Sequence, residues 1–278
     1  MKKIFKMVGL LAVFIGVYYF ATIFVGIIIG IVLIIINLAT GNIDLTINFE
    51  NYSEKYAYVT IIFVNIVTVL FMWVLFRIRK ENIFKNFNFN RINMKTIGLL
   101  IISAVLMQFF LSTLVSYVVQ IDGFSNMVTQ YTEITEPLML GNVLIVIIVM
   151  GIVTPIFEEF FFRGIIYNEL RKNLPVVVAL IIQAVIFAAF HGNIIQAIYT
   201  IILGVLLALI YNWYKSILSP IIFHLGFNIS GIVLSKFKTI QIFDNYRIVF
   251  LIFSALFLSV MFIPLWRNKT QNKEMTAV

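Results

Sequence analysis

Long apolar runs separated by short polar segments make up most of the chain, and each long run approaches or exceeds the roughly 20 residues that span a hydrocarbon core. Helices are expected, because a spanning segment must satisfy its backbone hydrogen bonds internally. The pattern therefore predicts an all-α polytopic membrane protein with about eight transmembrane helices. Their approximate limits are 7–39, 56–76, 96–120, 141–167, 176–191, 194–214, 217–235 and 247–266.

The first of these runs is longer than a single crossing requires. It also exceeds a signal-peptide core and lacks a small-residue cleavage pattern, so we expect it to be retained. Gly26 and Gly30 lie inside it. We expect the segment to be tilted in the membrane or broken near one of these glycines.

Composition supports a bilayer environment, since 62% of the residues are hydrophobic and only 12% are charged. The absence of cysteine excludes disulfides, thiolate nucleophiles and cysteine-ligated metals. A net charge of +8 is compatible with nucleic-acid binding, but the basic residues lie in short loops beside apolar runs. That distribution indicates membrane orientation, so we expect a lipid bilayer as partner and no nucleic acid.

Positive charge is unevenly divided between the two sides of the predicted spans. With the N-terminus inside, most of the 20 Lys and Arg residues fall on the cytoplasmic side. The outer loops hold only Lys55, Lys236, Lys238 and Arg247. Both termini are therefore predicted to be cytoplasmic. Six basic residues interleaved with Phe and Ile in segment 77–95 further predict a loop that lies on an anionic leaflet.

An acidic pair and an arginine interrupt the apolar run that begins near residue 141. Glu159 and Arg163 are four residues apart, so they share a helix face and can neutralise each other. Glu158 points about 100° away and has no partner from its own segment. Because a charge inside a membrane costs roughly 2.5 to 3.5 kcal/mol, Glu158 is a candidate for chemistry.

The only two histidines, His191 and His224, lie within or at the ends of later apolar runs. Phe187 precedes His191 by four residues, so the two rings share a helix face. Asn228 follows His224 by the same interval and lies one turn further along its helix. Counting residues from the expected helix ends puts these groups and Glu158 within about 10 Å of one another in depth. Helix tilt can absorb that spread, so a single intramembrane site is feasible.

The stretches "EEFFFR", "FAAFH" and "HLGFN" fit the motifs EExxxR, FxxxH and HxxxN in that order. The chain therefore resembles the CAAX protease and bacteriocin-processing family, CPBP or Abi, of intramembrane proteases. The resemblance implies that Glu158 and His191 activate a water that attacks a peptide carbonyl. It also implies that His224 and Asn228 stabilise the oxyanion. Glu159, Arg163 and Phe187 would then have supporting roles.

No metal is required on this interpretation, although zinc remains open. Glu158, His191 and His224 are the residues that would ligate it. Against zinc, the sequence has no HExxH helix to place two ligands one turn apart. The resemblance also divides the chain into N-terminal transmembrane helices, a four-helix catalytic core, and a last helix with a basic tail. Their limits are 1–135, 140–235 and 236–278.

Two functional classes fit these features. The first is an intramembrane endopeptidase that cleaves a membrane-associated protein or peptide, with the plasma membrane of a bacterium as its expected location. The second is a bacteriocin self-immunity protein or regulatory membrane scaffold that needs no proteolysis. A buried Glu–Arg pair or a lone histidine can serve helix packing alone, but the whole constellation favours the peptidase.

Overall fold

The computed structural model describes residues 2–40, 49–83, 87–121, 123–236 and 246–275. These residues are largely helical and contain no β-strand, which confirms the all-α prediction. Lys85 of the basic segment and Lys238 of the last outer loop lie outside the described residues. Contacts divide the chain into two units, residues 1–83 and residues 84–278, which are described separately.

The first unit is a pair of packed helices, α1 (Lys2–Ala39) and α2 (Phe49–Ile78). Their interface is aromatic: the Phe14 and Phe76 rings stack with centroids 5.8 Å apart, and the Phe20 and Phe71 centroids are 5.5 Å apart. Helix α1 is continuous, so the expected break near Gly26 or Gly30 is absent and that alternative is wrong. An unbroken helix keeps its backbone hydrogen bonds internal. Lipid offers no hydrogen-bond partners, so this requirement applies to the glycines as well as to the other residues.

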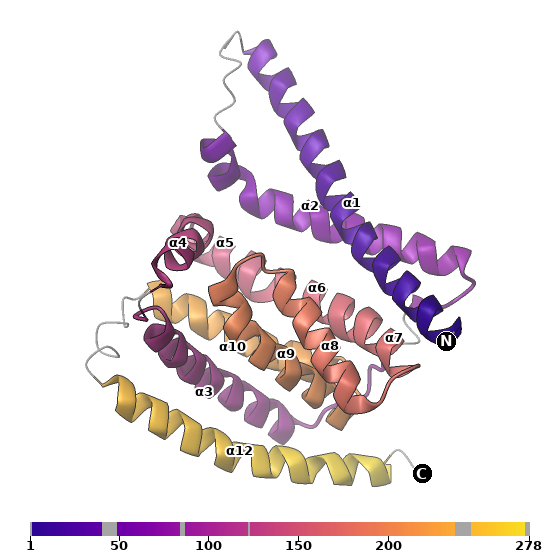
Figure 1. The fold of residues 1–278 in the computed structure, drawn as a ribbon, viewed down its shortest axis with the longest axis vertical. Helices are drawn as coiled ribbons and strands as arrows, with labels where there is room; N and C mark the ends of the chain where they lie inside the picture. The colour runs from indigo at the N-terminus through magenta and orange to yellow at the C-terminus, as the bar shows by residue number, and fades with distance from the viewer. Residues whose placement is uncertain (1, 41–48, 84–86, 122, 237–245, 276–278) are drawn as a thin grey trace. The chain divides into compact units, whose positions relative to one another are not determined.

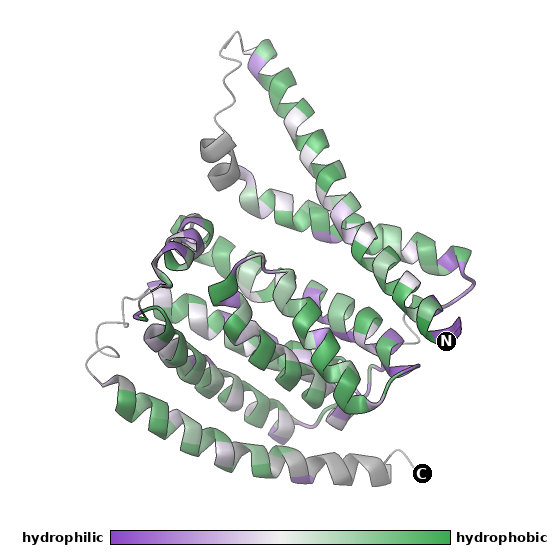
Figure 2. Ribbon diagram, viewed as in Figure 1, coloured by the Kyte–Doolittle hydropathy of each residue, from purple (hydrophilic) through white to green (hydrophobic). Residues whose placement is uncertain are grey.

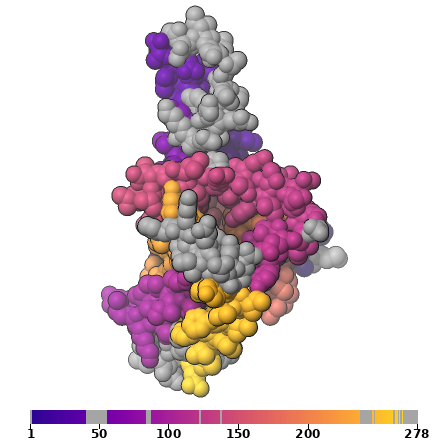
Figure 3. All heavy atoms as spheres, turned by 90° about the vertical axis from the view of Figure 1, so that its left-hand side faces the viewer, coloured from indigo at the N-terminus to yellow at the C-terminus, as the bar shows by residue number. Residues whose placement is uncertain are grey.

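The second unit is a helical bundle (Figure 1). Helix α3 (Met94–Val118) packs against both α10 (Leu218–Lys236) and α12 (Arg247–Met275), and α8 (Val176–Ala189) packs against α9 (Ile194–Tyr214). In the space-filling view the yellow spheres belong to α12, the helix that packs on α3 (Figure 3). Leu100, Leu207 and Phe223 are among the buried residues at the centre of this bundle.

Six described helical segments are long and apolar enough to cross a membrane, and two shorter ones are also apolar. Together they account for the eight predicted spans, and the helix at Ile194–Tyr214 has the predicted limits. Figure 2 shows hydrophobic residues along most of each helix, with hydrophilic ones concentrated toward helix ends and on one further helix, α4 (Ser125–Leu140). The polytopic membrane class is therefore confirmed.

The fourth predicted span is a continuous helical rod with two π-helical stretches. It runs through α5 (Val143–Val146), η2 (Ile147–Val153), α6 (Thr154–Glu158), η3 (Glu159–Tyr167) and α7 (Asn168–Arg171). π-helical turns are rare and are frequently found at functional sites. The acidic pair lies across the junction of α6 and η3, so this irregularity coincides with the candidate chemistry.

The loop before α3 packs directly on η3. Phe87 lies so close to Gly164 that a Cβ on the glycine would come within 2.3 Å of the phenylalanine ring. The same loop is joined to the α9–α10 corner, where the Ile217 N–H donates to the Asn88 carbonyl over 3.0 Å and the Asn90 side-chain amide donates to the Lys215 carbonyl over 2.7 Å. Loop, corner and η3 are thus held together.

Substituting Gly164→Ala is expected to destabilise the protein, because the buried Phe87 ring must move to make room. Overpacking of this kind costs about 1 to 3 kcal/mol. Thermal unfolding in detergent should show a lower midpoint for this variant. Gly98→Ala on α3 is the matched control, since a Cβ there meets nothing within 4 Å. An equal midpoint for the two variants would contradict the packing argument.

Helix α4 was not predicted, because residues 121–140 read as a polar outer loop. Its sequence nevertheless carries a helical signal: Val128, Tyr131, Ile134 and Leu138 recur at spacings of three and four residues. The helix lies against α9 and the start of the rod. An amphipathic helix thus covers part of the bundle where an irregular loop was expected.

Candidate active site

The structure gathers the candidate residues from three parts of the bundle. The acidic pair comes from the α6–η3 junction, His224 and Asn228 come from α10, and Phe187 and His191 come from the end of α8. Helix α10 packs on both α6 and η2, and α8 packs on η3. Three motifs up to 70 positions apart in the sequence (158 to 228) therefore lie on elements that pack against one another.

This region contains a buried ion pair. Arg163 Nη1 donates to Glu159 Oε1 over 2.8 Å, and both side chains are fully buried. The other end of the guanidinium donates to the Gly204 carbonyl over 3.2 Å. The guanidinium carbon lies 4.5 Å from the centre of the Phe187 ring, within cation–π range. The arginine thus has a carboxylate, a carbonyl and an aromatic face as partners.

His224 lies between the two glutamates. Its Nδ1 is 2.7 Å from Glu159 Oε1, the same oxygen that Arg163 contacts. Its Nε2 is 3.6 Å from Glu158 Oε2. Sequence spacing predicted that Glu158 would turn toward another helix, and the imidazole is the group it meets. The direct contact between His224 and Glu159 was not anticipated.

Glu158 differs from its neighbour in both exposure and contacts. Its side chain is 19% exposed, whereas that of Glu159 is 0% exposed. The 3.6 Å separation from His224 exceeds normal hydrogen-bond length, so the two groups are near each other without being fully paired. Of the two carboxylates, Glu158 is therefore the one that an incoming molecule can reach.

His191 is held by Phe187, one turn earlier on α8. Its Nδ1 is 2.9 Å from the Phe187 carbonyl, and the two rings meet edge to face with centroids 4.9 Å apart. The same phenylalanine ring has its centroid 6.0 Å from that of His224. Since a carbonyl only accepts, Nδ1 carries the proton and Nε2 presents its lone pair in the neutral ring. Phe187 thus contacts both histidines.

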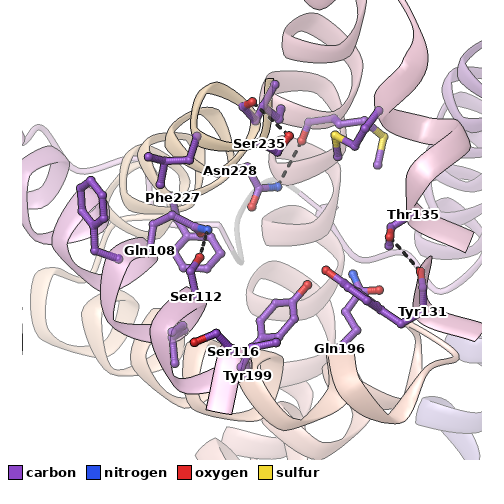
Figure 4. Close-up of a pocket in the computed structure, with 18 of the residues that line it drawn as sticks. Gln108, Ser112, Ser116, Tyr131, Thr135, Gln196, Tyr199, Phe227, Asn228 and Ser235 are labelled. Carbon is purple, nitrogen blue, oxygen red and sulfur yellow. Dashed lines mark hydrogen bonds between the residues drawn. The ribbon is translucent and has the colours of Figure 1, made fainter. Parts of the chain in front are cut away.

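Asn228 lies beside a cavity of about 470 Å³ that opens between α3, α4, α9 and α10. Its side-chain amide donates to the Met150 carbonyl of η2 over 3.1 Å (Figure 4). Hydroxyl and amide groups surround the same space. Besides Asn228, the polar lining residues are Gln108, Ser112, Thr113, Ser116, Tyr131, Thr135, Gln196, Tyr199 and Ser235.

These cavity residues were missed by sequence reasoning, although part of the signal was present. Gln108 and Gln196 interrupt predicted apolar spans, and a polar group inside a span carries a cost that often marks function. Tyr131 belongs to the unpredicted helix α4, and its side chain hydrogen-bonds that of Tyr199 on α9. Which polar residues share a cavity depends on helix packing, so one sequence does not reveal it.

The residues that would ligate zinc lie in different parts of the bundle. Within the described residues, no three His, Asp or Glu side chains cluster closely enough to hold one metal ion. Glu158, Glu159 and His224 gather, but the nearest oxygen of Glu159 is already engaged by Arg163. The candidate ligands Glu158, His191 and His224 do not form such a cluster, and the zinc alternative stays a prediction.

A comparison with protein-family models found a match over the segment that contains this site. Residues 140–230 match the family model described as type II CAAX prenyl endopeptidase Rce1-like. The matched segment contains all four proposed catalytic residues and the supporting pair. No curated protein and no solved structure matches the chain.

Proposed function

We propose that the chain is a membrane peptidase in which Glu158 is the catalytic base, since residues 140–230 match the family model of type II CAAX prenyl endopeptidase Rce1-like, in keeping with an intramembrane protease of CPBP type. Its substrate would be a peptide bond in a membrane-associated protein or peptide. The observation that carries the proposal is the position of Glu158, partly exposed and 3.6 Å from the His224 imidazole.

The protonation of His224 follows from its neighbours. Arg163 and His224 Nδ1 both approach Glu159 Oε1, which favours an ionised Glu159 that accepts from both. Nδ1 therefore carries a hydrogen. The proposed mechanism uses the form in which Glu158 is a carboxylate and His224 Nε2 also carries a hydrogen. That form pairs a base with a donor.

In that form the reaction can proceed without a covalent enzyme intermediate. Glu158 takes a proton from water as the water oxygen bonds to the carbonyl carbon. The carbonyl oxygen gains the negative charge and accepts hydrogen bonds from His224 Nε2–H and the Asn228 amide. The carbon–nitrogen bond then breaks as the proton moves from Glu158 to the leaving nitrogen. Water supplies the hydroxyl of one product and the hydrogen of the other.

His191 is proposed to assist Glu158 in activating the water. Its Nδ1–H is directed to the Phe187 carbonyl, so Nε2 is free to accept a hydrogen bond from water. Phe187 holds the ring from the side as well, through the edge-to-face contact. The imidazole is therefore oriented before any substrate arrives, which favours proton transfer along one direction.

Cells that carry the wild-type chain are expected to contain membrane peptides with new termini that are missing from cells carrying His191→Ala. Mass spectrometry of terminal peptides measures this difference. Phe190→Ala, beside the histidine just after α8, is the control for altered packing and should retain the new termini. If the histidine variant yields the same termini as the wild type, His191 has no catalytic role. If neither strain shows new termini but both keep the phenotype that the protein confers on the cell, the result favours the immunity or scaffold alternative.

A further inference from the structure

Two tyrosines beside the cavity have no part in the reaction described above. Tyr131 of α4 and Tyr199 of α9 both line the space that Asn228 borders, and each is half-buried. Figure 4 shows the two phenol rings beside the open space. Helix α9 also supplies the Gly204 carbonyl that accepts from the buried Arg163. The helix that carries Tyr199 therefore reaches both the cavity and the ion pair of the candidate site.

The Tyr199 hydroxyl belongs to a chain of hydrogen-bonding side chains. It hydrogen-bonds the Tyr131 hydroxyl and the Gln196 side chain, and Tyr131 in turn hydrogen-bonds Thr135. A phenolic hydroxyl has one donor and two acceptor positions, so Tyr131 and Gln196 use at most two of the three. When the Gln196 amide and the Tyr131 hydroxyl both donate, the hydrogen of Tyr199 is left for a group inside the cavity.

Tyr199 is also close to the proposed catalytic base. The Glu158 carboxylate lies near enough to the Tyr199 phenol to interact with it electrostatically. Asn228, which is proposed to stabilise the oxyanion, lines the same cavity as Tyr199. It lies one turn after His224, whose imidazole is 3.6 Å from Glu158. The hydroxyl of Tyr199 thus borders the region in which the reacting carbonyl is expected.

The proposed oxyanion donors are partly occupied by other contacts. The Asn228 side-chain amide donates to the Met150 carbonyl over 3.1 Å, so one of its two hydrogens is already used. His224 Nε2–H also lies beside the Glu158 carboxylate, which attracts the same hydrogen. An oriented, uncharged donor from another helix would add to the stabilisation of the negative oxygen.

We propose that Tyr199 is a further catalytic residue, whose hydroxyl donates a hydrogen bond to the scissile carbonyl oxygen as that oxygen becomes negative. Tyr131 is then a positioning residue, because its hydrogen bond from α4 orients the Tyr199 hydroxyl. The proposal rests on the peptidase function proposed above and adds a third oxyanion donor to it. No covalent bond to the phenol forms or breaks, so Glu158 still carries the proton of the attacking water.

Tyr199→Phe removes the hydroxyl and keeps the ring. The probe is a synthetic peptide that spans a new terminus found with the wild-type chain, added to the purified full-length chain in nanodiscs. We expect kcat to fall about 100-fold, the usual effect of losing one oxyanion donor, while KM changes by less than about threefold.

Tyr211→Phe is the matched control on the same helix. Tyr211 accepts from the Asn168 amide over 2.9 Å and is not among the described residues that line the cavity. This variant also loses a hydroxyl and a hydrogen bond, but its kcat should stay within about twofold of the wild type, since it donates nothing to the carbonyl. Equal kcat values for the two variants would overturn the proposal.

The Tyr131→Phe variant tests the positioning role. Its loss in kcat should be smaller than that of Tyr199→Phe, because the donor itself remains. The double variant Tyr131→Phe/Tyr199→Phe should be no slower than Tyr199→Phe alone, since Tyr131 acts through Tyr199. Losses that multiply in the double variant would show that Tyr131 acts by itself and would overturn the positioning role.

The dependence of kcat/KM on pH separates this role from a contact with the base. A hydroxyl that donates to the Glu158 carboxylate would favour its ionised form, so Tyr199→Phe would move the acid limb of the profile to higher pH. Such a shift with an unchanged maximum rate would overturn the role at the carbonyl oxygen. A lower maximum with the acid limb in place is the expected result.

The two proposals fail in different ways. Cleavage at the same rate by the wild type and by Tyr199→Phe would contradict the role of Tyr199 and leave the peptidase intact. The absence of any new terminus with the wild-type chain would contradict the peptidase, and the role of Tyr199 would fail with it.

Discussion

Replacing Glu158 with glutamine is expected to lower the rate of peptide cleavage by about 100- to 10,000-fold, the usual effect of removing a general base. Glutamine keeps the size of the side chain and can still hydrogen-bond, but it cannot take a proton from water. Cleavage assays on the purified protein in nanodiscs measure the change. The loss should appear in kcat, because the substitution removes a group that acts in the chemical step.

Folding provides the control for this variant. Glu158 is 19% exposed and no hydrogen bond fixes it to His224, so its neutral replacement should leave the unfolding midpoint nearly unchanged. Cleavage at the wild-type rate by a well-folded Glu158→Gln protein would exclude Glu158 as the base.

Glu159→Leu is expected to produce the largest loss of stability, about 3 to 5 kcal/mol, because it leaves a buried arginine charge without its carboxylate. The side chains of both Glu159 and Arg163 are fully buried, so water cannot compensate. The Gly204 carbonyl and the Phe187 ring remain as partners but carry no formal charge. Folded yield and urea unfolding in mixed micelles measure the effect.

The double variant Glu159→Leu/Arg163→Met separates stability from activity. Removing both charges is expected to recover most of the lost stability, since apolar residues of similar volume can replace a buried ion pair. Activity should stay low, because His224 Nδ1 would lose the carboxylate 2.7 Å away that orients it. Recovery of full activity in the double variant would show that Glu159 serves packing alone.

The sequence predicted the membrane-spanning helices well, because apolar length is a strong and local signal. The predicted span 194–214 coincides with α9, and 217–235 differs from α10 (Leu218–Lys236) by one residue at each end. The Glu159–Arg163 pair was also predictable, since helical periodicity alone brings residues four apart together. Each of these features depends only on residues that are close together in the sequence.

Features that depend on packing between helices were not predictable in the same way. The contact of His224 with Glu159 requires α10 to present one face to the α6–η3 junction, and nothing within HLGFN specifies that face. The π-helical stretches were likewise missed, because the expected helix had regular α periodicity. The orientation of the termini, the functional division of the chain and the roles of the site residues stay predictions.

The packing of Phe87 on Gly164 also bears on where a substrate is cut. The loop before α3 carries Arg91, and the α9–α10 corner joined to it carries Lys215. If the basic segment 77–95 lies on the leaflet, these two cations would hold the loop and the corner near the lipid headgroups. Glu158 precedes Gly164 by six positions (164 minus 158), which is at most about 9 Å of helix, because a π-helical stretch rises less per residue than an α-helix. About three residues of extended peptide cover that distance. Scissile bonds would then lie at a constant depth below the membrane surface, whatever residues flank them.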